Sequence, residues 1–190
     1  RYISELTGKI KQITGNKPLW QVIQAICYGY QKARALDEVE IAAFKSRPRE
    51  MAAGLTDAAC RKALKLIDRA ISWREIVEAR KIASKTMAGI PVDKDRAVLK
   101  VGIVGEIYTL LEPFTNLNLE TRLGYLGVEV DRSIYLSEWV NDHLFMGLIK
   151  GLRSRKEASI AAHPYLRHFV GGHGQETIGN AINYARAGYD

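Results

Sequence analysis

Two short segments place glycines beside side chains that can move protons. The first is Gly105-Glu106, which follows a run of mostly aliphatic residues at 97–104. Such a run predicts a strand buried on both faces, as in a parallel sheet. Ligands of open α/β sheets bind beyond the carboxyl ends of the strands, so Glu106 is a candidate general base or ligand-binding carboxylate. The alternative is a carboxylate that only hydrogen-bonds a neighbouring loop.

The second segment is the glycine-rich turn at 171–174, which contains His173 and precedes a helix expected from 175 to 187. Exposed N–H groups at the start of a helix suit a phosphate or a carboxylate, and His173 can supply a proton. The alternative is a flexible helix start in which Glu176 and Thr177 serve only as capping groups.

Taken together, the two turns predict one site, provided that they converge on a shared cleft. Glu106 and His173 are its predicted catalytic residues. The predicted cofactor-binding residues are the glycines of both turns, Gly105, Gly171, Gly172 and Gly174.

The common motifs for nucleotides and metals are missing. The turn at 102–105 lacks the Gly-x-Gly-x-x-Gly spacing of a dinucleotide site, and no Gly-x-x-x-x-Gly-Lys-Ser/Thr loop occurs, which disfavours NAD and ATP. Cys27 and Cys60 belong to separate helical patterns and are expected to be buried thiols rather than zinc ligands or disulfide partners. No metal-ligand spacing links the other three histidines, His143, His163 and His168. The residues therefore predict no metal site.

The first 90 residues have the apolar periodicity of helices. One helix is expected from Pro18 to about Phe44 and another from Asp57 to about Lys85, separated by Pro48, which cannot continue a helix. Thr56 is the expected N-cap of the second helix. Two long helices joined by a short loop favour an antiparallel hairpin. The first helix carries one apolar stripe, formed by Leu19, Ile23, Ile26, Tyr30 and Ala33.

A polar segment at 90–96 separates this helical half from a different pattern. We place a domain boundary there, with a helical segment at 1–94 and a second domain at 95–190. The chain starts at Arg1 and stops where an α/β protein would begin another strand, so we expect it to be cut from a longer protein.

The second domain reads as alternating strands and helices. The expected elements are strand 97–105, helix 118–124, strand 127–130, helix 137–169 with a break at His163-Pro164, and helix 175–187 followed by a left-handed Gly188. The first three form a βαβ unit. The predicted fold class is α/β, a partial Rossmann-like parallel sheet preceded by an all-helical segment.

Charge and hydropathy disfavour two classes of partner. The net charge is +7, but the densest basic run, at 150–156, is short and lacks interleaved aromatic residues, which disfavours nucleic-acid binding. No stretch approaches the roughly 20 apolar residues of a membrane span, and the first residues lack the apolar core of a signal peptide. We expect a soluble, cytoplasmic protein with neither nucleic-acid nor membrane partners.

Four runs of sequence resemble a known family. They are VGIVGEIY at 101–108, LEPFTNLNL at 111–119, LSEWV at 136–140 and GGHGQET at 171–177. The family is that of large bacterial and archaeal proteins named CoA-substrate-specific enzyme activase-related, which is similar to the iron–sulfur subunits of 2-hydroxyacyl-CoA dehydratases and to double-cubane-cluster proteins. The resemblance extends over most of the chain and is most specific from residue 98 onward.

The resemblance implies Rossmann-like lobes that hold a 4Fe–4S-type cluster on cysteine thiolates. An ATP-hydrolysing activator would reduce this cluster, and a CoA ester is the implied substrate. Neither Cys27 nor Cys60 matches a cysteine motif of the family, so the cluster is expected in the longer parent protein and not in these 190 residues. The implied lining of the cluster or substrate crevice is Glu106, Gly105 and the turn at 171–174.

Two function classes therefore remain open. The first is a piece of a dehydratase-related iron–sulfur protein, which requires both glycine turns to face one crevice. The second is a non-catalytic docking module that binds the activator or another subunit through its long helices, which requires an exposed apolar surface on the helical half.

Overall fold

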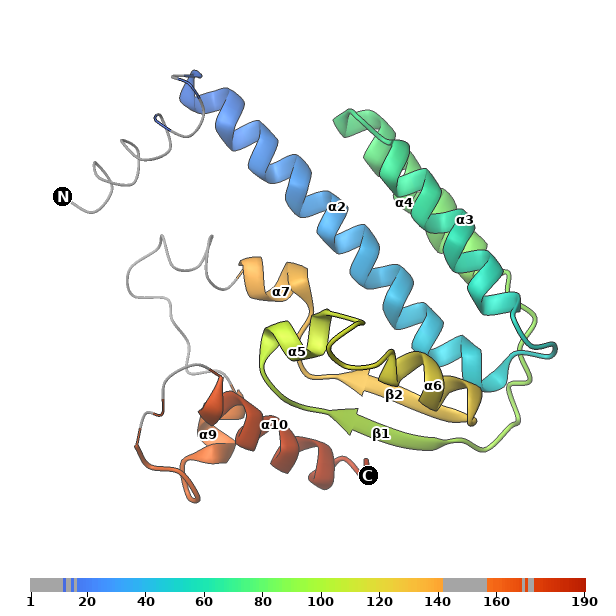
Figure 1. The fold of residues 1–190 in the computed structure, drawn as a ribbon, viewed down its shortest axis with the longest axis vertical. Coiled ribbons are helices and arrows are strands. Elements are labelled where there is room, and N and C mark those ends of the chain that lie inside the picture. Colours follow the sequence, from blue (N-terminus) through green and yellow to red (C-terminus); the bar gives the residue numbers. More distant parts are fainter. Residues whose placement is uncertain (1–11, 13–14, 16, 142–156, 169, 171–172) are drawn as a thin grey trace.

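The computed structural model describes residues 12, 15, 17–141, 157–168, 170 and 173–190. This part of the chain consists mainly of helices, with a small parallel sheet beside them (Figure 1). The helices are α2 (Leu19–Ser46), α3 (Leu55–Arg69), α4 (Trp73–Ala88), α5 (Ile107–Leu111), α6 (Leu119–Tyr125), α7 (Leu136–Val140), α9 (Glu157–Ala162) and α10 (Gly174–Arg186), the 3₁₀ turn is η1 (Arg47–Arg49), and the strands are β1 (Leu99–Ile103) and β2 (Val128–Arg132).

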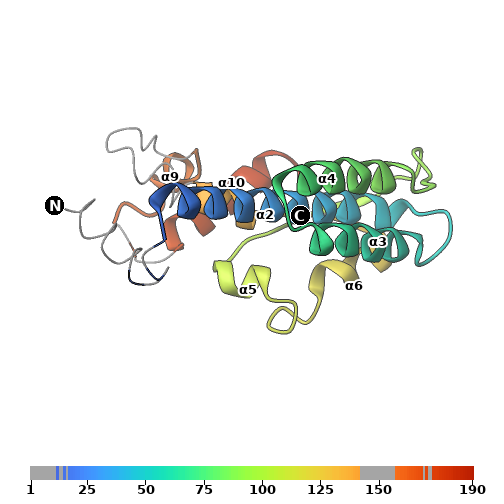
Figure 2. The same cartoon turned by 90° about the horizontal axis from the view of Figure 1, so that it is seen from above.

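Helices α2, α3 and α4 pack against one another and form the helical part of the molecule (Figures 1 and 2). Ile67 and Ile76 are completely buried between them. Alanines make up much of the remaining core, which allows the helices to approach closely because alanine has no side chain beyond Cβ. The buried alanines of this core are Ala35, Ala43, Ala63, Ala70, Ala79 and Ala83.

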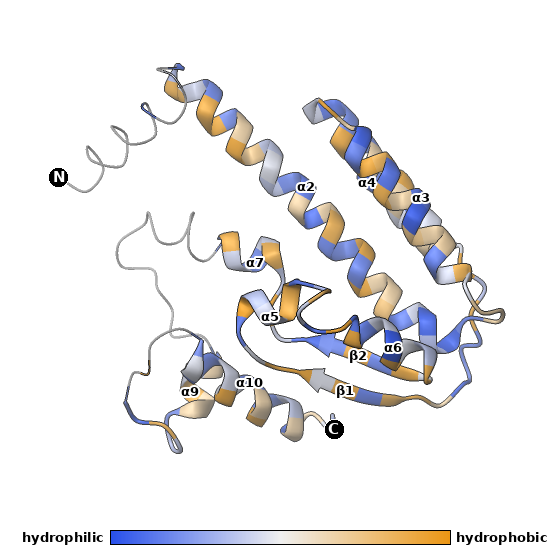
Figure 3. Ribbon diagram, viewed as in Figure 1, coloured by the Kyte–Doolittle hydropathy of each residue, from blue (hydrophilic) through white to orange (hydrophobic). Residues whose placement is uncertain are grey.

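The first half of the apolar stripe predicted along α2 is exposed. Leu19 and Ile23 are 46% and 53% exposed, whereas Ala33 is buried. The Tyr28 hydroxyl donates to the carbonyl of Ala70, at the turn between α3 and α4. The part of α2 before Tyr28 extends past that turn, and α3 and α4 leave most of its apolar stripe uncovered there (Figures 1 and 3).

The prediction of a single helix from Asp57 to Lys85 is wrong, because the chain turns at 70–72 and forms two helices, α3 and α4. Ser72 Oγ accepts a hydrogen bond from the N–H of Glu75 at 3.3 Å, and Glu75 Oε2 accepts one from the N–H of Ile71 at 2.8 Å. These reciprocal bonds satisfy N–H groups at the start of α4. The predicted hairpin is thus a group of three helices.

The N-cap residue of α3 is Gly54, whose φ of +90° suits glycine, and not the predicted Thr56. The carboxylate of Glu50 replaces the missing side-chain cap. It accepts hydrogen bonds from the N–H groups of Gly54 at 2.8 Å and Thr56 at 2.7 Å. A carboxylate is favourable at this position because the first turn of a helix carries partial positive charge.

Strands β1 and β2 are parallel, with Leu99 opposite Val128 and Ile103 opposite Arg132. The predicted βαβ unit is confirmed, although its connection contains α5 in addition to the predicted α6. On the other edge of β1, the N–H of Asp190 donates to the Lys100 carbonyl at 2.9 Å and the N–H of Gly102 donates to the Asp190 carbonyl at 3.0 Å. Strand β1 therefore has hydrogen-bonded neighbours on both edges.

Helices cover both faces of the sheet. Ile103 of β1 and Val130 of β2 pack with Phe44 of α2. The preceding residue of β1, Gly102, faces the opposite way and lies against the ring of Tyr184 in α10, where a Cβ would collide. The α/β class is thus confirmed for the described residues, and the Rossmann-like arrangement remains a prediction.

The elements predicted beyond residue 136 are partly outside the described residues. Helix α9 and all but the first residue of α7 fall in the single helix predicted at 137–169. The segment 142–156, with its basic run and His143, is outside the described residues. Helix α9 ends before the predicted break at His163-Pro164, and α10 matches the predicted last helix, with Gly188 at a φ of +77°. Among the described helices, none is long and apolar enough to cross a bilayer. The domain boundary near residue 94 stays a prediction.

Removing the cap of α4 should destabilise the protein. We expect Ser72→Ala to lower the free energy of unfolding by about 1 kcal/mol, because the N–H of Glu75 loses its partner. Urea unfolding followed by circular dichroism measures the change. Ser84→Ala, on the exposed side of the same helix, is the matched control and should change the stability by less than about 0.5 kcal/mol. Equal effects of both substitutions would contradict the capping role.

Candidate functional site

The two predicted catalytic residues meet in the structure. Nδ1 of His173 lies 2.7 Å from Oε1 of Glu106, although 67 positions separate them in the sequence. Glu106 is the N-cap residue of α5, directly after the loop that leaves β1, and His173 is the N-cap residue of α10. Because α10 packs against β1 with its first turn at the carboxyl end of the strand, both side chains lie at the same edge of the sheet.

A second contact joins the same two segments. The hydroxyl of Thr177 donates to the carbonyl of Gly105 at 3.4 Å, and the N–H of Thr177 donates to the carbonyl of His173 at 2.8 Å. A Cβ at Gly105 would lie 3.7 Å from Leu110, which is ordinary contact, so space alone does not require glycine there. Gly174 begins α10 beside Val170, whereas Gly171 and Gly172 lie outside the described residues. The binding roles of these glycines stay predictions.

The hydrogen bond from His173 lowers the pKa of the Glu106 carboxyl below its ordinary value, and the charge of a protonated His173 acts in the same direction. The histidine side chain is 13% exposed, whereas that of Glu106 is 54% exposed. The carboxylate therefore holds the imidazole in one orientation while remaining open to solvent. Nε2 of His173 lies 4.0 Å from Oε2 of Glu176, so carboxylates flank both nitrogens of the ring. An imidazole held between carboxylates is an arrangement that can transfer protons in catalysis.

The position of the pair matches the usual location of ligands in α/β proteins. After β1 the chain adds β2 on one edge, and Asp190 later returns to the opposite edge of β1. In open α/β sheets, ligands bind beyond the carboxyl ends of the strands. Glu106 and His173 lie at this end of β1.

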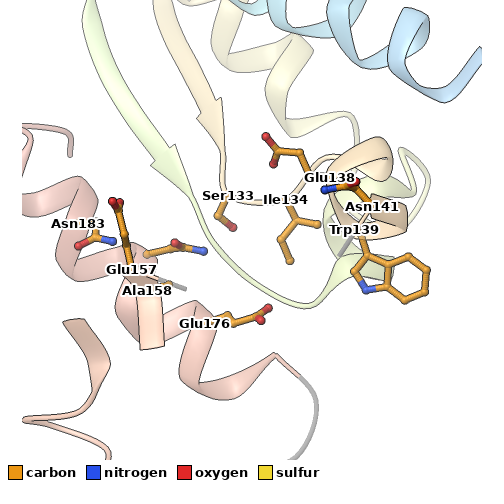
Figure 4. Close-up of a pocket in the computed structure, with 10 residues that line it drawn as sticks. Ser133, Ile134, Glu138, Trp139, Asn141, Glu157, Ala158, Glu176 and Asn183 are labelled. Carbon is orange, nitrogen blue, oxygen red and sulfur yellow. The ribbon is translucent and has the colours of Figure 1, made fainter. Parts of the chain in front are cut away.

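A cavity of about 470 Å³ lies next to the pair, between the carboxyl end of β2 and helices α7, α9 and α10 (Figure 4). Glu176 links the two features because it lines the cavity and also approaches His173. The residues that line it are Ser133, Ile134, Glu138, Trp139, Asn141, Glu157, Ala158, Glu176, Asn180 and Asn183. Helices α9 and α10 touch at Gly179, where any Cβ would collide with the carbonyl of Ala158, a residue that lines the cavity.

Sequence reasoning missed most of this cavity. One signal was visible, because Glu176, Asn180 and Asn183 recur at four- and three-residue steps and therefore form a polar stripe on one face of α10. The residues contributed by β2, α7 and α9 had no such signal, because only the tertiary fold brings them to the same place.

The cysteines of these 190 residues do not by themselves fit an iron–sulfur cluster, which needs several cysteine thiolates at one point. The chain has two cysteines, Cys27 on α2 and Cys60 on α3. Burial raises the pKa of the Cys60 thiol, which favours the protonated form that does not bind iron. In the described ranges, no cluster of three or more His, Cys, Asp or Glu side chains is arranged for a metal ion.

Comparison with known proteins gives no relative. No family model, curated protein or solved structure matches the chain.

The interaction of the pair can be measured through Glu106. We expect His173→Ala to raise the pKa of Glu106 towards 4.5, since the hydrogen bond from the imidazole is the main cause of its lowering. Carboxyl NMR of selectively labelled glutamate during a pH titration measures this change. The stability that the pair contributes should be fully present above about pH 4.5 and lost as the pH falls through the lowered pKa of Glu106.

His163→Ala, at the exposed end of α9, is the control for this titration and should leave the pKa of Glu106 unchanged. An unchanged Glu106 pKa in His173→Ala would show that the two side chains are not in contact in solution.

Proposed function

We propose that this chain is part of an iron–sulfur protein related to the 2-hydroxyacyl-CoA dehydratases. Such a protein takes part in ATP-dependent low-potential electron transfer, or in the dehydration or reduction of a CoA ester. The proposal starts from the resemblance of the four runs at 101–108, 111–119, 136–140 and 171–177. Its main structural support is the 2.7 Å contact between Glu106 and His173, which come from two of these runs.

In this proposal the pair transfers protons and the cluster is held elsewhere. Removing water from a hydroxyacyl thioester requires a base for a C–H proton and an acid for the departing hydroxyl. Glu106 has a lowered pKa and is ionised at neutral pH, so it orients the imidazole. His173 is then the group that exchanges the proton, because its Nδ1 faces Glu106 whereas its Nε2 lies on the side of Glu176. The cluster thiolates come from outside these 190 residues.

The test uses a longer protein that contains this chain, purified and reconstituted without oxygen. We expect iron and sulfide in stoichiometric amounts, an EPR signal on reduction, and turnover of a 2-hydroxyacyl-CoA ester with its activator and ATP. His173→Gln should lower kcat by about 10²- to 10⁴-fold, as expected for loss of general acid–base catalysis, and should leave the iron content unchanged. The 190-residue chain alone should bind no stoichiometric iron.

His168→Gln is the matched control, because this exposed histidine lies in the segment before α10 and its side chain makes no contact with Glu106. It should leave both kcat and iron content unchanged. A longer protein that takes up no cluster after careful reconstitution would overturn the proposal. A cluster-containing protein whose His173→Gln variant keeps full activity would remove the role of the pair.

A second candidate function is a docking module, and the exposed apolar residues of the helical part favour it. These residues lie at the end of the helices farthest from the sheet (Figures 1 and 3). They are Leu19, Trp20, Ile23, Ile71 and Trp73, each at least 46% exposed. An exposed group of large apolar side chains is typical of a protein interface. In this alternative the occupant is the ATP-hydrolysing activator that the resemblance implies.

The docking alternative predicts a local effect of one substitution. Ile71→Ser should weaken binding of the activator by at least tenfold in sedimentation velocity, because Ile71 is 83% exposed and its loss leaves the folded chain unchanged. Leu126→Ser replaces an apolar residue of similar exposure next to the sheet and should have no effect. Equal binding by both variants would exclude this end of the helices as the contact.

A further inference from the structure

We propose that Thr177 is a positioning residue for His173, which it keeps close to Glu106. Its N–H donates to the carbonyl of His173, and its hydroxyl donates to the carbonyl of Gly105, the residue before Glu106. Thr177 is therefore bonded to both segments that carry the pair. The inference rests on the proposed function, because positioning affects catalysis only if the pair transfers protons.

The attachment of α10 to β1 shows why this residue matters. Helix α10 packs beside β1 (Figure 1). The ring of Tyr184 lies against Gly102, and the backbone of Asp190 exchanges hydrogen bonds of 2.9 and 3.0 Å with the strand. Both contacts lie at the end of α10 farthest from His173. The contact of Thr177 with Gly105 joins the first turn of α10 to the end of β1, next to the pair.

The sequence left open a role for Thr177 as a capping group of α10. In the structure its hydroxyl donates to the carbonyl of Gly105, 72 positions earlier in the chain, at 3.4 Å. The hydroxyl therefore joins two elements that only the tertiary fold brings together. The distance is longer than the roughly 2.5–3.0 Å of a usual O–H···O hydrogen bond, so Thr177 is expected to adjust the pair and not to hold it alone.

A displacement of Thr177 would move His173 as well. The two residues are four positions apart, which places them on the same side of the helix start, and the N–H of Thr177 donates to the carbonyl of His173 at 2.8 Å. If the first turn of α10 moved away from Gly105, the imidazole would move away from Glu106. A hydrogen bond such as the 2.7 Å contact of the pair weakens with distance, so a small movement would reduce it.

The first test measures the pair in the 190-residue chain by carboxyl NMR of labelled glutamate. Thr177→Val removes the hydroxyl at nearly constant size and should raise the pKa of Glu106, but by less than His173→Ala does. Thr177→Ser keeps a hydroxyl and should leave this pKa unchanged. The N–H groups of Ile107 and Tyr108, which also lower the pKa of Glu106, belong to α5 and stay in place in both variants.

A double variant shows whether Thr177 acts through the imidazole. In the His173→Ala background, Thr177→Val should have no further effect on the pKa of Glu106. Thr86→Val is the matched control, because the hydroxyl of Thr86 also donates to a backbone carbonyl, at 2.8 Å, but on α4. It should leave the pKa of Glu106 unchanged.

Circular dichroism of each variant shows whether it is folded, and Thr177→Ala is the second variant, with the same expected direction. An unchanged pKa of Glu106 in the folded variants would overturn the proposal. So would an equal rise with and without His173, because Thr177 would then act on the loop of Glu106 directly.

The second test uses the longer protein with its activator, ATP and a 2-hydroxyacyl-CoA ester. Thr177→Val should lower kcat by about tenfold and leave KM and the iron content unchanged, because a small misplacement of a proton-transfer group slows the chemical step. Thr177→Ser should restore kcat. Unchanged kcat in Thr177→Val would overturn the positioning role. A longer protein without turnover would count against the proposed function, and the NMR titration would still decide whether Thr177 positions His173.

Discussion

The arrangement of the molecule depends on one buried cation, Arg132 at the end of β2. Its side chain is 3% exposed and is surrounded by groups from several elements. Nη2 lies 2.5 Å from Glu40 on α2, Nη1 lies 3.4 Å from Glu120 on α6, and Nε donates to the carbonyl of Ile134 at 3.0 Å. The guanidinium also lies over the ring of Tyr135, 4.9 Å from its centroid. A buried charge is tolerated only when it is paired in this way, so these elements are held in one arrangement.

The backbone after Arg132 leads directly to the candidate site. Ile134, which accepts the hydrogen bond from Arg132, also lines the cavity, and the neighbouring Ser133 pairs with β1. Further along, the N–H of Ser137 donates to Asp37 of α2 at 2.7 Å, which fixes the beginning of α7. The residues on the β2 and α7 sides of the cavity are thus positioned by α2, a helix that does not touch the Glu106–His173 pair in any described contact.

The sequence predicted the features that depend on short-range patterns. The aliphatic run at 97–104 indicated β1, and the glycine-rich turn at 171–174 indicated the start of α10. The topological rule placed only Glu106, at the carboxyl end of a parallel strand. That the His173 turn converges on the same cleft was a condition of the prediction, and the packing of α10 against β1 brings the two residues together. Their chemistry could be proposed from residue type, but their 2.7 Å separation could not.

Features that depend on tertiary contacts were missed or misjudged. The break between α3 and α4 was visible as Ser72 followed three positions later by Glu75, but the apolar periodicity continues across it and suggested one helix. The exposed start of α2 has the same periodicity as a buried helix, because periodicity records an apolar face and not the neighbour that covers it. The wall of the cavity formed by α7 and α9 could not be predicted from the sequence, because only the tertiary fold brings these helices to the same place.

The close contact of Gly179 with Ala158 has a mechanical consequence. With no side chain between the two backbones, α9 and α10 form one closely packed unit. This unit carries Glu157 on one helix and His173 at the beginning of the other. A displacement of α9 that keeps this contact therefore also displaces the beginning of α10 and changes the distance between His173 and Glu106.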